Sequence, residues 1–145
     1  MRCVLQRVKQ AQVRAEGQVV GSIGGGLLVF LGIAREDTLV QADELAKKII
    51  ELRIFEDKAG KMNLSALQVG SEILVVSQFT LYGNCDKGRR PSFDQAAEPQ
   101  QAQSLYEYFV QALKKKNVKV ATGRFRAMME VELVNDGPVT FILDT

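Results

Sequence analysis

Histidine is absent from this chain of 145 residues. Without it there is no Ser-His-Asp or Cys-His catalytic arrangement, and the commonest general base is missing. The two cysteines, Cys3 and Cys85, follow no metal-binding spacing, which favours free thiols in a reducing compartment and argues against zinc. No apolar run reaches the roughly 18 residues of a membrane-spanning helix. We therefore expect a cytoplasmic protein with no membrane segment, metal or other cofactor.

An excess of one charge is also missing. The chain has 19 Lys and Arg against 17 Asp and Glu, so a polyanionic partner would have to contact a local basic patch. Two such clusters exist: Lys87, Arg89 and Arg90 in a loop, and Lys114, Lys115, Lys116 and Lys119 at the end of a predicted helix. The second has a simpler explanation, because cations at a helix C-terminus complement the helix dipole. The first lies where a loop can hold phosphates.

The apolar pattern predicts one α/β domain over residues 1–145, whose length and 46% hydrophobic content suffice for a single core. The expected helices begin at Asp37 or Thr38 and at Pro99, and end near Leu52 and Asn117. The segment 57–68 is polar and predicts a loop with at most a short strand. The expected strands cover 2–8, 12–20 with a turn at Glu16-Gly17, 27–33, 73–76, 119–121, 128–134 and 139–143. The resulting order is ββ(βα)2βββ, with helices on one side and strand layers able to face each other.

The buried strand 73–76 runs into the polar segment Ser77, Gln78, Phe79 and Thr80. If the strand continues, Gln78 and Thr80 share one face while Ser77 and Phe79 share the other. Two interpretations remain open. The strand can simply leave the core with its hydroxyl groups bonded to backbone, or the segment can form a pocket floor, since ligands often bind at the carboxyl ends of buried strands.

A second unusual segment runs from Asn135 to Thr140. Its Asp136-Gly137 pair lies between apolar stretches and is typical of a hairpin turn. Pro138 conflicts with that interpretation, because it fixes φ and removes a backbone donor where the returning strand should start. Local sequence favours an unusual tight turn with a trans proline, since only about 5 to 6% of such bonds are cis in folded proteins.

These two segments carry a resemblance that extends from Met1 to Thr145. The chain resembles the D-aminoacyl-tRNA deacylase family, also called D-tyrosyl-tRNA deacylases. The supporting motifs are Leu5-Gln6-Arg7-Val8, Gly60-Lys61-Met62-Asn63, Ser77-Gln78-Phe79-Thr80, Arg90-Pro91-Ser92-Phe93, Thr122-Gly123-Arg124-Phe125 and Asn135-Asp136-Gly137-Pro138-Val139-Thr140.

The resemblance implies a homodimer of three-layer β/β/α subunits that hydrolyses the ester of D-aminoacyl-tRNA. It implies that the Gly137-Pro138 bond is cis and enters the active site of the other subunit, with Arg7 holding it in place. A related branch that acts on L-alanine lacks Ser-Gln-x-Thr, so this chain is similar to the D-selective side. Backbone carbonyls of Gly137 and Pro138 would then exclude an L side chain, and glycine on alanine tRNA should also be cleaved.

By the same resemblance, Ser77 and Thr80 belong to the substrate site, and Phe125 and Met129 line the terminal adenosine site. We favour Thr80 as a binding and orienting group, because an unassisted threonine hydroxyl is a weak nucleophile. Backbone amides of Gln78 and Phe79 would polarise the ester. Two alternatives are a non-catalytic tRNA-binding module and a small-molecule esterase.

Overall fold

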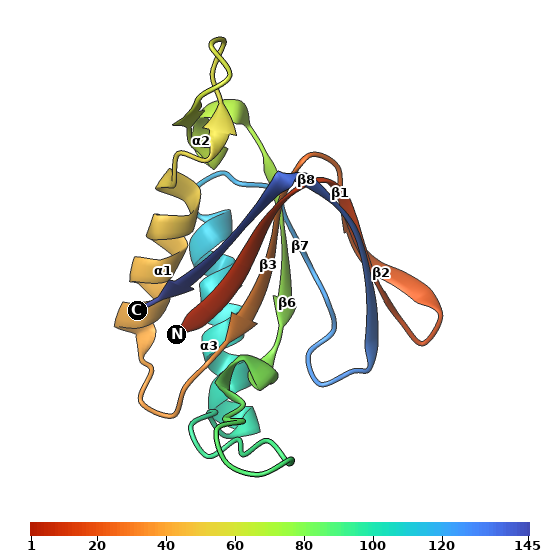
Figure 1. Ribbon diagram of the computed structural model, residues 1–145, viewed down its shortest axis with the longest axis vertical. Helices are drawn as coiled ribbons and strands as arrows, with labels where there is room; N and C mark the ends of the chain where they lie inside the picture. The colour runs from red at the N-terminus through yellow and green to blue at the C-terminus, as the bar shows by residue number, and fades with distance from the viewer.

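The computed structural model describes residues 1–145 as one α/β domain (Figure 1). Its strands are β1 (Arg2–Ala15), β2 (Gln18–Ile23), β3 (Gly26–Gly32), β4 (Phe55–Glu56), β5 (Met62–Leu64), β6 (Glu72–Ser77), β7 (Val120–Thr122) and β8 (Met129–Asp144). Its helices are α1 (Leu39–Glu51), α2 (Ala66–Val69), α3 (Pro99–Lys114) and a short 3-10 helix, η1 (Phe79–Tyr82).

A six-stranded sheet organises the domain. Its order is β2-β1-β3-β6-β7, and β8 pairs with β1. The central pairs β3–β6 and β6–β7 are parallel, while β1 is antiparallel to each of its three neighbours. The continuous apolar runs predicted strands that are buried on both faces, and β3 and β6 confirm this.

Alternation along the central strands divides the apolar residues between two cores. Leu27, Val29 and Leu31 of β3 face a cluster that includes the buried residues of α1 and α3. Leu28 points the other way, into a second cluster with Val13 and residues of β2 and β6. Helices therefore cover one face of the sheet, and strands cover part of the other.

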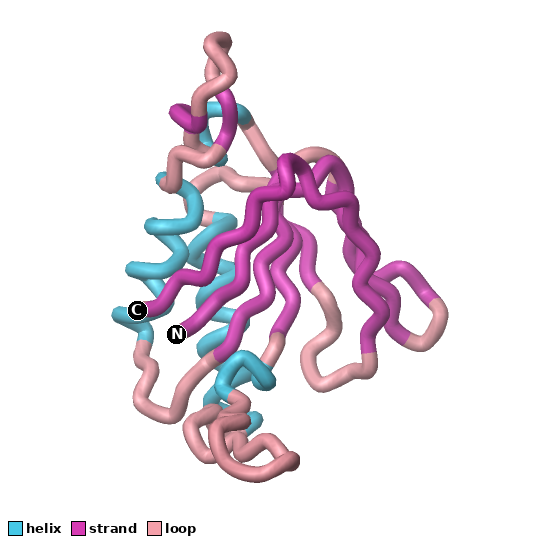
Figure 2. Tube along the Cα trace, in the orientation of Figure 1, coloured by secondary structure: helices cyan, strands magenta, loops and turns pink.

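The covering strands belong to the same sheet, because β1 and β8 are long and bend over it (Figure 2). The sequence predicted β1 as two strands, but it continues without a break to Ala15 and turns at Glu16-Gly17 into β2. The separate strands predicted over 128–134 and 139–143 are likewise wrong. They form one strand, β8, which pairs with β1 on both sides of residues 136–139.

The two long helices follow their predicted caps. Thr38 caps α1 in a reciprocal capping box with Gln41, and Pro99 occupies the first turn of α3. Asp37 is not the cap. Its carboxylate instead accepts a hydrogen bond from the Ala34 amide at 2.6 Å and contacts the Met1 amino group at 2.5 Å.

The segment 57–68 is more ordered than predicted. It overlaps the β4-β5 hairpin, defined here as residues 55–64, and the short helix α2. A signal for α2 was present, because Ser65 and Gln68 have the spacing of a capping box, and both of its hydrogen bonds are formed. The α/β class and the single domain are confirmed. No helix is both long and apolar enough to span a membrane.

Candidate active site

The Ser77–Thr80 segment lies where the buried strand β6 ends. β6 stops at Ser77, and the chain enters η1 at Phe79. The Gln78 amide donates to the Leu31 carbonyl at 2.8 Å, and the Gln78 side-chain amide donates to the Thr80 hydroxyl oxygen. Gln78 thus fixes both the backbone of this segment and the position of the Thr80 hydroxyl, which is exposed.

Two expectations for this segment are wrong. Strand alternation does not apply beyond Ser77, so Gln78 and Thr80 meet because of a turn into the 3-10 helix. The Gln78 backbone amide is also occupied by Leu31, and it is not available to polarise a substrate. Of the two amides assigned to that role, only the amide of Phe79 remains in the hypothesis.

Aromatic side chains border the segment. Phe79 is 55% exposed, and its ring lies 4.9 Å from the Phe93 ring, centroid to centroid, at an angle of 60°. An exposed phenylalanine ring leaves apolar surface in contact with water. A ligand that covered this surface would remove it from water, so the pair is a candidate wall for a ligand.

Arg2 and Tyr82 also contact this region, although no sequence motif predicted a role for them. The Arg2 guanidinium donates to the Leu81 carbonyl at 3.2 Å, pairs with Asp144 at 2.7 Å and lies 5.4 Å from the centroid of the Tyr82 ring. Burial, followed by the charge of Asp37, raises the pKa of Tyr82 to about 12, so its hydroxyl stays protonated near neutral pH. No local pattern could have revealed these contacts, because Arg2 is distant in sequence.

The predicted basic loop follows η1 directly. Asn84 and Ser92 close it with paired backbone hydrogen bonds of 2.7 and 2.9 Å. Lys87, Arg89 and Arg90 lie within the closed loop, are exposed and form no ion pair. Their charge is therefore free to meet an anion beside the Ser77–Thr80 end of the sheet.

Phe125 and Met129 flank the loop after β7, at the same edge of the sheet. The Gly123 amide donates to the Val75 carbonyl at 3.1 Å, two residues before Ser77. The Phe125 ring is half-buried and lies 5.8 Å from Tyr106, whose hydroxyl donates to the same carbonyl. Met129 begins β8, and its sulfur packs close to Gly123.

The Gly137-Pro138 segment is a bulge, where local sequence favoured a tight turn. Between Asn135, which pairs with Val8, and Thr140, which pairs with Gln6, β8 has residues 136–139 where β1 has only one residue. The Gly137-Pro138 bond is cis, contrary to the trans proline that local sequence favoured. Both residues are exposed.

The Asn135 side chain closes the base of this bulge. Its amide nitrogen donates to the carbonyls of Arg7 and Val139 at 3.4 and 3.2 Å, and its oxygen accepts from the Val139 amide at 3.0 Å. No separate role was predicted for Asn135 from the sequence. Asn side chains often form hydrogen bonds to the backbone of a neighbouring turn. An Asn before a Gly-containing turn is therefore the sequence pattern that predicts this contact.

Arg7 connects the bulge to the β4-β5 hairpin. It is 4% exposed and donates to the Ile54 carbonyl at 2.7 Å, while a second nitrogen lies 3.5 Å from the Glu56 carboxylate. Its Nε lies 3.0 Å from the Asp136 carboxylate, a charge contact whose angle is too poor for a hydrogen bond. One buried cation therefore holds two exposed segments beside each other.

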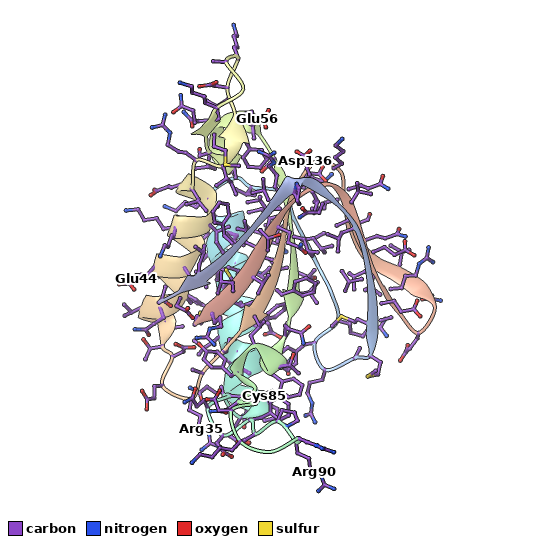
Figure 3. The ribbon with its side chains drawn as sticks, viewed as in Figure 1. Arg35, Glu44, Glu56, Cys85, Arg90 and Asp136 are labelled. Carbon is purple, nitrogen blue, oxygen red and sulfur yellow. The ribbon has the colours of Figure 1, made fainter.

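The two predicted motifs lie at opposite ends of the sheet. Leu31 of β3 pairs with Ser77, whereas Gly26 of β3 pairs with Val8, which in turn pairs with Asn135. These positions are five residues apart on β3, about 17 Å along the strand. Figure 3 shows the same separation, with Asp136 and Glu56 at one end and Cys85 and Arg90 at the other. A single chain does not bring Gly137 and Pro138 to Thr80.

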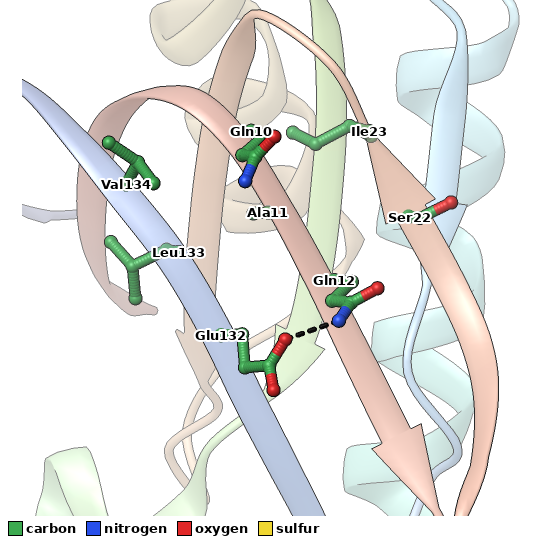
Figure 4. Close-up of a pocket in the computed structure, with 8 residues that line it drawn as sticks. All are labelled: Gln10, Ala11, Gln12, Ser22, Ile23, Glu132, Leu133 and Val134. Atoms are coloured by element: carbon green, nitrogen blue, oxygen red, sulfur yellow. Dashed lines mark hydrogen bonds between the residues drawn. The ribbon is translucent and has the colours of Figure 1, made fainter.

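A depression of about 370 Å³ lies elsewhere, on the outer face of β1, β2 and β8 (Figure 4). Gln12 donates to the Glu132 carboxylate across it. None of the predicted site residues lines it. No three His, Cys, Asp or Glu side chains come together as a metal-ligand set.

The fold is an α/β domain in which a polar segment follows the carboxyl end of the central strand β6, a position where ligands often bind in such sheets. Comparison with known proteins then gives the family. The family model for D-Tyr-tRNA(Tyr) deacylase matches residues 4–144. The chain is 58% identical over 145 residues to a D-aminoacyl-tRNA deacylase of Thermosipho africanus, covering all of this chain and 97% of that protein. A D-aminoacyl-tRNA deacylase of Desulfatibacillum aliphaticivorans is 59% identical, with 100% and 99% covered. The chain belongs to the D-aminoacyl-tRNA deacylase family, whose members are ester hydrolases.

Two solved structures are also similar. The first, titled c-Myc DNA unwinding element binding protein, is 40% identical with a TM-score of 0.93, covering 100% of this chain and 99% of that one. The second, a probable eukaryotic D-amino acid tRNA deacylase, has a TM-score of 0.88 at 19% identity, covers 99% of this chain and 98% of that one, and supports the fold alone.

Proposed function

We propose that this protein is a cytoplasmic editing hydrolase that cleaves the ester of D-aminoacyl-tRNA and releases the D-amino acid and tRNA. The observation that carries the proposal is full-length membership of the deacylase family. An aminoacyl ester is already activated, and the neighbouring ribose 2′-hydroxyl can help to orient water. The protein then has to bind, orient and stabilise negative charge, which a site without histidine can do.

In this mechanism Thr80 orients the substrate, and the Phe79 amide polarises the ester carbonyl. The hydrogen bond from the Gln78 side chain supports an orienting role, because Gln78 donates to the Thr80 hydroxyl and cannot remove its proton. Ser77 lies at the strand end beside them, and Phe125 and Met129 receive the terminal adenosine. The exposed Phe79 ring on Phe93 supplies an apolar wall.

The proposed active form is a homodimer of three-layer β/β/α subunits with sites that cross between them. The separation of Gly137-Pro138 from Thr80 within one chain supports this form. A two-fold related copy that lies antiparallel would bring the bulge of each subunit to the Ser77–Thr80 segment of the other.

An apolar row on the outer face of the sheet supports the same assembly. Ile142 is 67% exposed and pairs with Val4, which pairs with Phe30 on its other side. Directly paired residues point to the same face, so these side chains form a strip across β8, β1 and β3, one residue from the Leu31–Ser77 pair. An exposed apolar strip of this kind favours a protein contact.

Stereochemical selection would come from the bulge. The backbone carbonyls of Gly137 and Pro138 would occupy the space of an L side chain and leave room for a D side chain. Since glycine has no side chain to exclude, glycyl-tRNA(Ala) should be a substrate as well. The contacts of Arg7 and Asn135 support a fixed position for this backbone.

The direct test compares hydrolysis of tRNA charged with D-tyrosine, L-tyrosine and glycine. We expect release of D-tyrosine and glycine and retention of L-tyrosine. Equal cleavage of the D and L forms would refute the filter.

The non-catalytic tRNA-binding alternative rests on the basic loop, and binding of tRNA without any ester cleavage would favour it. A small-molecule esterase would instead cleave D-amino acid esters that lack tRNA, with little dependence on salt.

The cross-subunit site has its own test. In Thr80→Trp a large side chain at an exposed position fills the pocket, and in Gly137→Ala the bulge is altered. The Thr80→Trp dimer should be inactive and the Gly137→Ala dimer should cleave both the D and L forms, whereas mixed dimers contain one site with an intact pocket and an intact bulge. Selective cleavage of the D form on mixing supports the crossed site, and unselective cleavage by verified mixed dimers contradicts it.

A further inference from the structure

The β4-β5 hairpin is a second feature that projects from the end of the domain carrying the bulge, as the labelled Glu56 and Asp136 show (Figure 3). Arg7 contacts Ile54 and Glu56 on one side and Asp136 on the other, so the hairpin and the bulge are held as one unit. Any partner that the bulge reaches therefore also meets the hairpin.

The hairpin tip is built to keep its shape. The Asp57 carboxylate accepts from the amides of Ala59 and Lys61 at 2.8 and 3.1 Å and from the Asn63 side chain at 3.1 Å. The Asp57 amide donates to the Lys61 carbonyl at 2.8 Å, and Gly60 adopts a φ of 73°. These bonds close the tip around its only carboxylate.

The charge left on the tip is positive. Hydrogen bonds from the amides of Lys61 and Ala59 hold the pKa of Asp57 below its usual range, so that charge is engaged inside the turn. Lys58 and Lys61 are exposed and have no carboxylate within ion-pair distance. Glu56, the other acidic residue of the hairpin, lies at its base beside Arg7.

We propose that Lys58 and Lys61 of one subunit contact phosphates of the tRNA acceptor end that is bound in the pocket of the other subunit. This inference rests on the proposed function and its crossed dimer. The bulge that enters the partner pocket brings the hairpin with it, and the ester lies at the end of a phosphate chain that must leave the pocket. Two ammonium groups without ion-pair partners, on a rigid tip at that exit, can bind phosphate oxygens. Such contacts raise the affinity for tRNA but carry no sequence specificity.

The first test measures binding of uncharged tRNA at several salt concentrations for the wild type and for Lys58→Ala/Lys61→Ala. Loss of two phosphate contacts should weaken binding and reduce the slope of log affinity against log salt by about 1.4 to 1.8. The matched control is Lys47→Ala/Lys115→Ala, which removes the same charge beside a depression between α1 and α3. An unchanged slope in the hairpin variant, or an equal loss in the control, overturns the proposal.

Hydrolysis provides a second arm. The hairpin variant should show a raised KM and an unchanged kcat on D-tyrosyl-tRNA, and it should cleave D-tyrosine esterified to adenosine, which has no phosphate, like the wild type. An equal loss on the phosphate-free ester would place the effect in the pocket and overturn the proposal. If the wild type binds tRNA but cleaves no ester, the proposed function fails, and the salt slope still decides the role of the hairpin in binding.

Mixed dimers assign the lysines to a subunit. With Thr80→Trp in one subunit, the remaining active pocket belongs to the other and receives the bulge and hairpin of the Thr80→Trp chain. Adding Lys58→Ala/Lys61→Ala to the Thr80→Trp chain should raise KM, and adding it to the other chain should not. The reverse result would mean that the hairpin serves its own pocket, contrary to the proposal.

Discussion

At the scale of single residues, Gly137 combines a positive φ with crowded surroundings. Its φ is 123°, and a Cβ at this position would lie 2.6 Å from a Val139 methyl group and 3.3 Å from an Arg7 nitrogen. The other glycines with positive φ have no atom within 4 Å of such a Cβ. Only at Gly137 do both conformation and space exclude a side chain.

Gly137→Ala should therefore destabilise the fold by about 1 to 3 kcal/mol and displace the bulge, with a loss of discrimination between D- and L-tyrosyl-tRNA. Urea unfolding and paired hydrolysis assays measure the two effects. Gly24→Ala is the matched control, because no atom lies within 4 Å of its Cβ and its φ is not positive. Unchanged stability and selectivity in Gly137→Ala would contradict the assignment.

Thr80 provides the second test at this scale. Its hydroxyl accepts from Gln78, and the chain contains no histidine to remove its proton. Thr80→Ala should retain measurable deacylation with a larger effect on KM than on kcat, as judged by steady-state kinetics. Complete loss of kcat with intact tRNA binding would instead indicate that Thr80 is the nucleophile.

Cys3 gives a prediction for pH. Burial raises the pKa of this thiol to about 12 from an ordinary value of 9.0. The folded-state pKa lies above the unfolded one, so this stabilisation is complete below about pH 9 and is lost as pH rises toward 12. At about pH 10.5 the unfolding free energy should fall by about 2 kcal/mol from this group.

Urea unfolding at both ends of this pH range measures the loss. Burial also raises the pKa of Tyr82 and Tyr106, with the same sign of effect. Cys3→Ala keeps both tyrosines and should show a smaller dependence on pH. An identical dependence in the two proteins would contradict the assignment to Cys3.

At the scale of secondary-structure elements, Arg7 joins segments that are far apart in sequence. It lies on β1 and contacts the start of the β4-β5 hairpin and the bulge of β8. Since its side chain is buried while those of Glu56 and Asp136 are partly exposed, the guanidinium is the group whose removal leaves a gap.

Arg7→Met should lower stability by about 1 to 3 kcal/mol, because the Ile54 carbonyl loses its donor. Amide hydrogen exchange should accelerate together in residues 55–64 and 135–139. The control is Arg14→Met on the same strand, where the arginine makes no ion pair. Faster exchange in only one of the two segments would show that Arg7 does not couple them.

At the scale of the whole molecule, the proposed site depends on association. The strip of Ile142, Val4 and Phe30 crosses β8, β1 and β3 on the outer face of the sheet, and we expect this face to meet its copy in the dimer. A charged side chain introduced into an apolar contact of this kind remains solvated in the monomer but loses its water on association.

Ile142→Lys should consequently give a folded monomer that has lost deacylation. Sedimentation and far-ultraviolet circular dichroism measure the two properties, and Val19→Lys, at a valine 46% exposed on β2, is the control. A dimeric and active Ile142→Lys protein would show that the interface lies elsewhere.

The predictability of the fold differed between its parts for physical reasons. β3, β6, α1 and α3 followed from apolar periodicity and caps, which are properties of neighbouring residues. The continuous β8 did not, because Asp136-Gly137 is a turn signal and only pairing with β1 carries the chain past it. Likewise, the end of β6 at Ser77 reflects packing of η1 against β3 and could not be read from alternation.

The sequence by itself determined the α/β class, the buried central strands and, through its motifs, the family. These depend on local preferences and on residue identity, both of which are present in the unfolded chain. The tertiary structure decided that Gln78 bonds to Leu31 and Thr80, that Arg7 joins the hairpin to the bulge, and that the two motifs lie at opposite ends of one sheet. Such contacts join residues distant in sequence, and only strand register brings them together or keeps them apart.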